Sequence, residues 1–498
     1  MLRQKLFSSQ SYFFGAASHI FFSLIGKVLG FFSQILAITL LGATRETDIV
    51  LFVFGFLALF SMFFTRYSGD VLLPRIVRNQ KAGEDKVESE IGLLILILLA
   101  FCSLFQIFAL EITAFLGNFS KSDLQELIPG LRCLLLLPIG VFLGDLFLQV
   151  LQSRKNFLFS SSVSILQGAS ILILVPIFHE NLGSNSLAVA LSLAPWIQTI
   201  ILFLVLRKEL PFSLHPAKLF RVNRATLSWI SLSFLLQLNH FLQVFLPERS
   251  AAQFAGGDLT TVLLAKKVFE ILPHLLVFPV VHVAFPRICA RLEAGNWKTI
   301  REYLQSLFRV TIVLSLPAAS FLFLFSEEIT RLLFLHGKIQ SSQVMSLKQA
   351  LCLFIPSFLG LIFVSVGSKT IFASSNTKVI RNYAFFQFVL SLLLIPLLAW
   401  SCKVFGLMGV PLSITIFHCI QIPAHLFALN WLGISLEGHR DWLFCVAILS
   451  LTGILTVSDL NLMDLLGFWT IGLLLCFYLF YFLQGKHLKD SLSVLKKS

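Results

Sequence analysis

Long apolar runs recur along the whole of this 498-residue chain, and each is long enough to cross the core of a lipid bilayer. That core is about 30 Å thick and needs roughly 20 helical residues. The runs are continuous rather than alternating, which favours helices over the strands of a barrel. Only 13% of the residues are charged, against about 25% in a soluble domain. The sequence therefore predicts an all-α polytopic membrane protein.

Dividing the apolar runs at clusters of charged and turn-forming residues predicts about fourteen transmembrane helices. The predicted spans are residues 11–41, 48–74, 91–116, 126–152, 156–178, 186–206, 225–247, 259–286, 303–326, 342–374, 380–401, 405–432, 442–461 and 464–484. The N-terminal run has no small-residue cleavage site after it, so we expect an uncleaved first span.

The loop charges predict an orientation. Of the 38 Lys and Arg residues, 24 fall on the side shared with the two termini, 6 on the opposite side and 8 within spans. Because cations collect in cytoplasmic loops, both termini are predicted to be cytoplasmic. The net charge of +13 then follows from membrane topology, and we expect no nucleic-acid partner.

The longest connection, residues 207–224, lies near the middle of the chain and carries five cations and two prolines. It predicts a basic cytoplasmic linker after a first six-helix lobe at 1–206. No connection is long enough to hold a soluble catalytic domain.

Charged residues inside spans are expensive, at about 2.5–3.5 kcal/mol for one at a helix centre. Lys27 lies in mid-span between Gly26 and Gly30, where small residues permit close approach of another backbone. It is predicted to be a cation that faces a cavity and meets an anion, and the alternative is a structural pair with a neighbouring acid.

A second group of charges lies in the eighth predicted span. Lys266 and Lys267 point about 100° apart on a helix, so at most one faces a given cavity. Glu270 is within reach of both, and the alternative to a binding role is a local ion pair. Pro273 and Pro279 follow and predict a kink.

Other intramembrane charges carry weaker predictions. Arg66 and Asp70 have the spacing of a helical ion pair, and a structural role is favoured there over ligand binding. Asp145 has no obvious local partner and is a candidate for ion coupling. The remaining cations within spans are Arg132, Arg309, Lys348 and Lys369, of which the first three lie near span ends where side chains snorkel.

The excess of cations over acids in these spans suggests an anionic ligand, such as a phosphate or pyrophosphate on a lipid carrier. The chain has no GxxxxGK[ST] motif, no HExxH and no nucleophile elbow. Its eight cysteines form no CxxC pair or His/Cys cluster. We therefore expect a transporter without an ATPase motif, a catalytic residue, a cofactor or a metal.

Several segments together resemble the MurJ (MviN) family of lipid II flippases, within the multidrug/oligosaccharidyl-lipid/polysaccharide exporter (MOP) superfamily. These segments are Gly26–Phe31, Leu41–Ala43 with Thr47–Asp48, Leu72–Pro74, Ala265–Pro286, Leu316–Ala318 with Phe334–Ile339, Phe372–Lys378 and Gly406–Leu412. The similarity extends over most of the chain.

The resemblance implies two pseudo-symmetric six-helix lobes, the second at 225–432, then two extra helices and a basic tail at 433–498. It implies a central cavity, alternating access, and outward movement of undecaprenyl-pyrophosphate-linked peptidoglycan precursor across a bacterial inner membrane, in cell wall biogenesis and cell shape. Lys27 and Lys267 match arginines of the family, and Asp48 matches an acid. The implied partners are this anionic lipid-linked glycan, membrane lipids and cell-wall synthesis proteins.

The sequence departs from the family pattern at several positions. A second first-span cation of the family falls at Ser33, next to Gln34, and a second-span arginine falls near Phe60 or Ser61, with Arg66 one to two turns further on as a substitute. Lysine also lacks the bidentate fork of arginine. An exporter of another lipid-linked oligosaccharide or of a small solute, an enzyme acting on the same lipid, and a non-transporting divergent paralogue are the alternatives.

Overall fold

The structure is a computed structural model, and it describes residues 12–67, 86–153, 159, 162–207, 224–295, 297–374 and 376–434. Within these residues every regular element is a helix. The chain divides into two compact units, Met1–Thr261 with His336–Gln343, and Val262–Leu335 with Val344–Ser498. The predicted linker at 207–224 lies almost entirely outside the described residues, so the predicted lobe boundary there stays a prediction.

The first unit contains the helices that correspond to the first seven predicted spans. They are α2 (Tyr12–Leu41), α3 (Arg45–Tyr67), α5 (Lys86–Ile107), α6 (Ala109–Gly117), α7 (Lys121–Gln125), α8 (Ile128–Leu134), α9 (Leu137–Ser153), α11 (Ser164–Leu182), α12 (Asn185–Leu206) and α13 (Arg224–Ala251). The third predicted span is broken, because α5 and α6 meet at an angle of 89°.

The second unit begins inside α14 (Asp258–Leu272). A π-helical turn, η3 (Pro273–Val277), separates α14 from the next helix, and it begins at the first of the two prolines that predict a kink. The further helices are α15 (Phe278–Glu293), α16 (Trp297–Leu324), α17 (Ser326–Phe334), α18 (Ser341–Phe354), α19 (Ser357–Ala373), α20 (Thr377–Ser391), α21 (Leu394–Phe405), η4 (Gly406–Met408) and α22 (Gly409–Asn430).

Twelve of the predicted spans coincide, in order, with a helix or a run of consecutive helices in the described residues. Seven helical stretches there are individually long and apolar enough to cross a membrane, or nine if each of two bent pairs is one span. The spans predicted at 442–461 and 464–484 lie outside the described residues. The prediction of an all-α polytopic membrane fold is confirmed.

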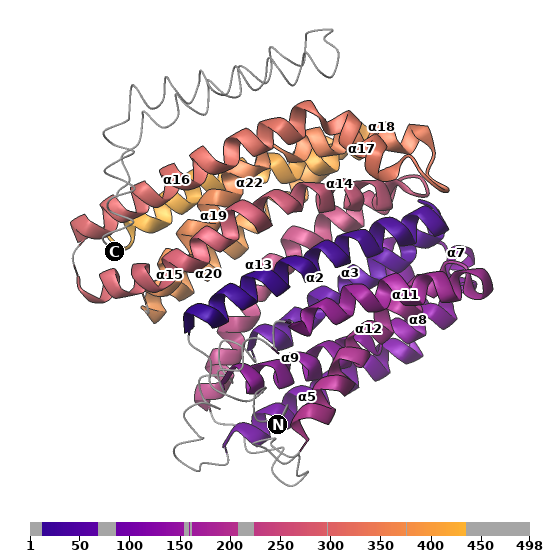
Figure 1. Ribbon diagram of the computed structural model, residues 1–498, viewed down its shortest axis with the longest axis horizontal. Coiled ribbons are helices and arrows are strands. Elements are labelled where there is room, and N and C mark those ends of the chain that lie inside the picture. Colours follow the sequence, from indigo (N-terminus) through magenta and orange to yellow (C-terminus); the bar gives the residue numbers. More distant parts are fainter. Residues whose placement is uncertain are drawn as a thin grey trace. The chain divides into compact units, whose positions relative to one another are not determined.

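The helices α2 and α11 pack closely along their length, as Figure 1 shows for the indigo and magenta ribbons of the first unit. The contact centres on Gly168, because a Cβ atom there would lie 2.7 Å from the backbone nitrogen of Gly30. The predicted close approach of a backbone beside Lys27 is therefore present, and it is made by α11.

Phenylalanine rings fill the space between α3, α5 and α13. Phe60 of α3 stacks on Phe101 of α5 with ring centroids 3.6 Å apart. Phe56 of α3 contacts Phe241 and Phe245 of α13 at 5.9 and 5.8 Å. Part of the phenylalanine content of the sequence thus forms an internal aromatic core in the first unit.

A buried polar contact joins α20 to α22 in the second unit. The ring nitrogen Nδ1 of His425 lies 2.8 Å from the carbonyl oxygen of Gln421, so it carries the proton. Nε2 then accepts a hydrogen bond of 2.8 Å from the hydroxyl of Tyr383. Both polar side chains are satisfied, as burial away from water requires.

The α2–α11 contact gives a test of the packing. Gly168→Ala is expected to destabilise the protein by about 1–3 kcal/mol, because the new methyl group meets backbone atoms that cannot move aside. Gly30→Ala is the matched control, since a Cβ atom there meets nothing within 4 Å. Thermal unfolding of purified protein in detergent measures both. Equal midpoints for the two variants would contradict the packing described here.

Candidate functional site

Residues 42–48 make up the turn between α2 and α3 and the first turn of α3, and they carry the polar side chains between two apolar stretches. Thr44 and Thr47 cap the start of α3 reciprocally, because each backbone N–H is bonded to the other hydroxyl, at 2.8 and 3.3 Å. The hydroxyl of Thr47 also donates to the carbonyl oxygen of Gly42 at 3.1 Å. These contacts fix the direction in which the first side chains of α3 point.

The carboxylate of Asp48 caps a helix that begins more than two hundred residues later. It is fully buried and accepts bonds from the backbone nitrogen of Gly257 at 2.7 Å and from that of Thr260 at 2.7 Å. The hydroxyl of Thr260 adds a third bond at 2.6 Å. These donors belong to the first turn of α14, whose free amides and positive dipole end favour an anion.

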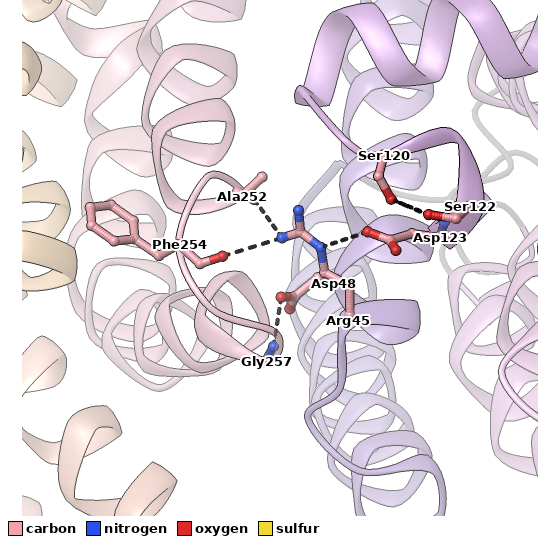
Figure 2. A network of polar contacts seen from close by, with 8 residues as sticks. All are labelled: Arg45, Asp48, Ser120, Ser122, Asp123, Ala252, Phe254 and Gly257. Carbon is pink, nitrogen blue, oxygen red and sulfur yellow. Dashed lines mark hydrogen bonds and ion pairs between the residues drawn. The ribbon is translucent and has the colours of Figure 1, made fainter.

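Arg45 binds the other side of the same connection (Figure 2). Its Nη1 atom donates to the carbonyl oxygens of Ala252 at 2.7 Å and Phe254 at 3.4 Å, just beyond the C-terminus of α13. Its Nε atom lies 3.5 Å from a carboxylate oxygen of Asp123, and its guanidinium lies 4.7 Å from the ring centroid of Phe119. A cation thus meets the negative end of α13 while Asp48 meets the positive end of α14.

Two further segments are bonded to the same turn. The side-chain nitrogen of Gln343 donates to the carbonyl oxygen of Ala43 at 2.8 Å. The backbone nitrogen of Lys338 donates to the carbonyl oxygen of Thr39 at 3.1 Å. Both donors lie in 336–343, the segment that belongs to the first unit although its neighbours in sequence belong to the second. Glu46 accepts a bond from the hydroxyl of Ser184.

We call this set the α3 clamp: Arg45, Glu46 and Asp48 at the start of α3, the backbone carbonyls of Thr39 and Ala43, and their partners in residues 119–123, 184, 252–260 and 338–343. The chain passes between the two units at 261/262, 335/336 and 343/344. The clamp therefore holds, within the first unit, the segments that lead to each of these crossings.

Glycine is required where the clamp is tightest. Gly257 has φ +91°, and a Cβ atom there would lie 2.3 Å from the carbonyl oxygen of Ala43. Gly337 has φ +68°, and a Cβ atom added there would lie 2.2 Å from the carbonyl oxygen of Thr39. Side-chain-bearing residues rarely adopt such φ values, and here they also lack space.

Three of the predicted intramembrane cations lie on α2 and α14. Lys27 has an exposed side chain in mid-helix, and Lys266 and Lys267 are half-buried on α14. The ammonium of Lys267 lies 3.4 Å from a carboxylate oxygen of Glu270, which is the local ion pair anticipated from the spacing. Roles for these residues in binding an anion stay predictions.

The other predicted positions are placed as follows. Asp145 does have a local partner, because Gln149 donates to it from the next turn of α9 at 2.7 Å; its ion-coupling role stays a prediction. Arg66 lies in α3, while Asp70 is outside the described residues. Lys369 lies 5.3 Å above the ring of Phe285.

The positions that carry further cations in the family pattern are packed differently in this chain. Ser33 is buried and donates to the carbonyl oxygen of Gly30 at 2.8 Å. Ser61 donates to that of Leu57 at 2.7 Å, and Phe60 belongs to the aromatic core. The departures seen in the sequence are therefore accommodated by ordinary helix packing.

A separate ionic contact joins α17 to α18. Glu327 lies 2.5 Å from the ammonium of Lys348 and 2.8 Å from the guanidinium of Arg331. The hydrogen bond from Lys348 lowers the pKa of Glu327 below its ordinary value, and the two positive charges add to this effect while partial burial opposes it. Lys348, predicted to snorkel from a span end, is thus paired with an acid.

Metal binding finds no support in the described residues, where no group of three or more His, Cys, Asp or Glu side chains is placed to hold an ion. The family resemblance singled out Asp48 as a candidate for substrate binding, a role that stays a prediction, and sequence reasoning missed Arg45, Thr260 and Gln343. No local signal points to them, since their partners are 207 to 300 positions away in the chain.

The helical fold matches those of two solved structures. It is similar to a structure titled lipid II flippase MurJ, inward closed conformation, with a TM-score of 0.73 and 17% identity over 93% of this chain and 99% of the other. It is also similar to an inward-facing multidrug resistance MATE family transporter of the MOP superfamily, with a TM-score of 0.65 and 14% identity over 87% and 99% of the two chains.

The sequence comparisons identify the family. The family model described as lipid II flippase MurJ matches residues 56–247 and 225–482, so the chain belongs to this family. Proteins named probable lipid II flippase MurJ include one from Buchnera aphidicola, 22% identical over 90% of each chain. Another, from Helicobacter pylori, is 25% identical over 90% of this chain and 99% of its own.

The cap on α14 can be tested by stability. Asp48→Ala is expected to lower the free energy of unfolding by about 1–3 kcal/mol, because it leaves buried donors without an acceptor. Thr260→Val should lower the free energy of unfolding by less, about 1 kcal/mol, since only one of the three hydrogen bonds to Asp48 is lost. Thr261→Val is the matched control, because its hydroxyl bonds only the carbonyl oxygen of Gly257, which its own backbone nitrogen also reaches. A loss for Thr261→Val as large as that for Asp48→Ala would contradict the cap.

The α17–α18 contact predicts a pH dependence. Because the folded-state pKa of Glu327 lies below its ordinary value of 4.5, its ionised form stabilises the fold above that value, and this contribution disappears as the pH falls through the lowered pKa. The difference in thermal midpoint between wild type and Glu327→Gln should therefore shrink as the pH is lowered. Glu328→Gln, at the exposed neighbour, should show no such trend, and a constant difference for Glu327→Gln would refute the contact.

Proposed function

We propose that this chain is a flippase that moves a polyprenyl-pyrophosphate-linked peptidoglycan precursor, lipid II, from the inner to the outer leaflet of a bacterial cytoplasmic membrane by alternating access. Support comes from membership of the lipid II flippase MurJ family, from relatives that carry the same name and from the polytopic helical fold. The chain belongs to a family of transporters, not of enzymes, and it carries no P-loop motif.

The observation that carries the proposal at the level of residues is an exposed cation in the middle of an apolar helix. Lys27 keeps its side chain exposed on α2 at a depth where a charge is costly unless it faces an aqueous or ligand-binding space. The doubly charged pyrophosphate of a lipid carrier offers several acceptor oxygens to such a cation. Lys267, and with it Lys266 and Arg66, are the further cations that we propose contact the anion during the cycle.

The α3 clamp supplies a structural element that alternating access needs. Such a cycle requires contacts that hold one state and are broken in the other. Charge-assisted hydrogen bonds are worth about 1.5–3 kcal/mol each, so the bonds of Arg45 and Asp48 amount to several kcal/mol. That is the scale needed to invert a two-state population, which takes about 5.5 kcal/mol. We propose that the clamp is closed in one state of the cycle and released in the other.

The charges of the loops support an orientation with both termini in the cytoplasm. In that orientation the α2–α3 turn and the α3 clamp lie on the outer side of the membrane. The direction of transport proposed here, from cytoplasm to outer leaflet, then requires release of the clamp to open the outward path.

An exporter of a different lipid-linked oligosaccharide is the second candidate, and one observation favours it. The positions of two additional family cations are occupied by Ser33 and by the Phe60–Ser61 pair, which are packed and hydrogen-bonded within their own helices. A less positive site with lysines in place of arginines makes fewer bidentate contacts to a pyrophosphate. A smaller or singly charged anionic headgroup would be served by such a site.

The test is complementation. A bacterium depleted of its lipid II flippase is expected to regain precursor on the outer leaflet when it expresses this chain. Lys27→Ala and Lys267→Ala should each abolish this activity while the protein stays at normal levels in the membrane, because the anion loses its cation. Lys403→Ala is the matched control at an exposed lysine in the last turn of α21. Normal activity in both Lys27→Ala and Lys267→Ala would overturn the site. If the unmutated chain itself does not restore precursor on the outer leaflet, that result would favour the second candidate.

A further inference from the structure

Four cations cluster at the end of the hairpin formed by α15 and α16. Arg287 and Arg291 lie one turn apart on α15, and Lys298 and Arg301 lie at the start of α16. Arg287 directly follows the predicted end of one span, and Tyr303 begins the next span. The group is therefore at the depth of lipid headgroups, on the side predicted to be cytoplasmic.

The two arginines of α15 converge on one tyrosine of α16. Tyr303 is almost fully buried, with 1% of its surface exposed. The guanidinium of Arg291 lies over its ring, 4.1 Å from the centroid, and Arg287 donates a hydrogen bond to its hydroxyl. The ring of Tyr303 thus contacts one guanidinium while its hydroxyl contacts the other, and both are brought to the same end of the hairpin.

This arrangement leaves a donor without an acceptor. The Nη1 atom of Arg291 is buried and has no hydrogen-bond partner among the described residues. A buried guanidinium N–H without an acceptor is costly, and two guanidinium groups at one ring also repel each other. Arg291 as a whole is only partly buried, so part of its side chain other than Nη1 is open to the surroundings of the hairpin end.

We propose that Arg291 and Arg287 form a binding site for a phosphate group at the end of the α15–α16 hairpin, with Tyr303 as the residue that positions both guanidinium groups. A phosphate supplies several acceptor oxygens and a negative charge, and it matches the planar fork of arginine. At this depth the phosphate belongs to an anionic phospholipid headgroup or comes free from solution. The site uses neither Lys27 nor Lys267 and does not depend on the flippase assignment.

Binding is measured on the full-length protein, purified in detergent, by native mass spectrometry with phosphatidylglycerol and with phosphatidylcholine as the reference lipid. Wild type is expected to retain phosphatidylglycerol in preference. Arg291→Gln should weaken that retention about tenfold, the effect of losing one charge-assisted hydrogen bond. Lys298→Gln is the matched control, because it removes an exposed charge from the same hairpin end without removing a guanidinium fork, and it should lower retention much less than Arg291→Gln.

Two further arms make the outcome decisive. Arg291→Lys keeps the charge but loses the fork, so it should bind at a level between wild type and Arg291→Gln even if the glutamine variant folds poorly. Addition of inorganic pyrophosphate distinguishes the two sources, since competition indicates a site open to free phosphate and its absence indicates a headgroup site. Retention of phosphatidylglycerol by Arg291→Gln at the wild-type level, or an equal loss with Lys298→Gln, would overturn the proposal.

Discussion

The buried carboxylate of Asp48 is the contact on which much of the first unit depends. Amides at the start of a helix that are buried within the protein are cut off from water, so they need an acceptor from the protein itself. For α14 that acceptor comes from the first turn of α3, through Gly257 and Thr260. One side chain thereby fixes where α14 begins, and α14 carries the lysine pair proposed to meet the substrate.

Arg45 makes the arrangement complementary in charge. Helix α13 ends and helix α14 begins within one short connection, so its two sides present carbonyl oxygens and amide hydrogens respectively. A cation and an anion three residues apart on α3 match this polarity. Because both come from one rigid turn of helix, the connection is held at a defined angle rather than merely tethered. An interaction of this kind is suited to two discrete states, since it is lost as a unit when the connection shifts.

The sequence was sufficient for the fold class and the order of the helices, because apolar runs of membrane-spanning length and the loop charges are local signals. The break at Pro273 and the pairing of Lys267 with Glu270 were also predictable, since both follow from neighbours within one or two turns. The 89° bend between α5 and α6 was not, because neither helix contains a proline there. The partners of Arg45 and Asp48 were also beyond reach, because only tertiary folding brings residues 45 and 252 together.

The two strained glycines of the α3 clamp have a consequence for how such chains diverge. Gly257 and Gly337 each combine a left-handed backbone with a backbone carbonyl in the place of a side chain. No single substitution at either position is tolerated without displacing the α2–α3 turn itself. Binding-site lysines and arginines can be exchanged as substrates change, whereas these two glycines are constrained by backbone geometry alone. They therefore offer a substrate-independent marker for recognising remote relatives whose charged residues have drifted.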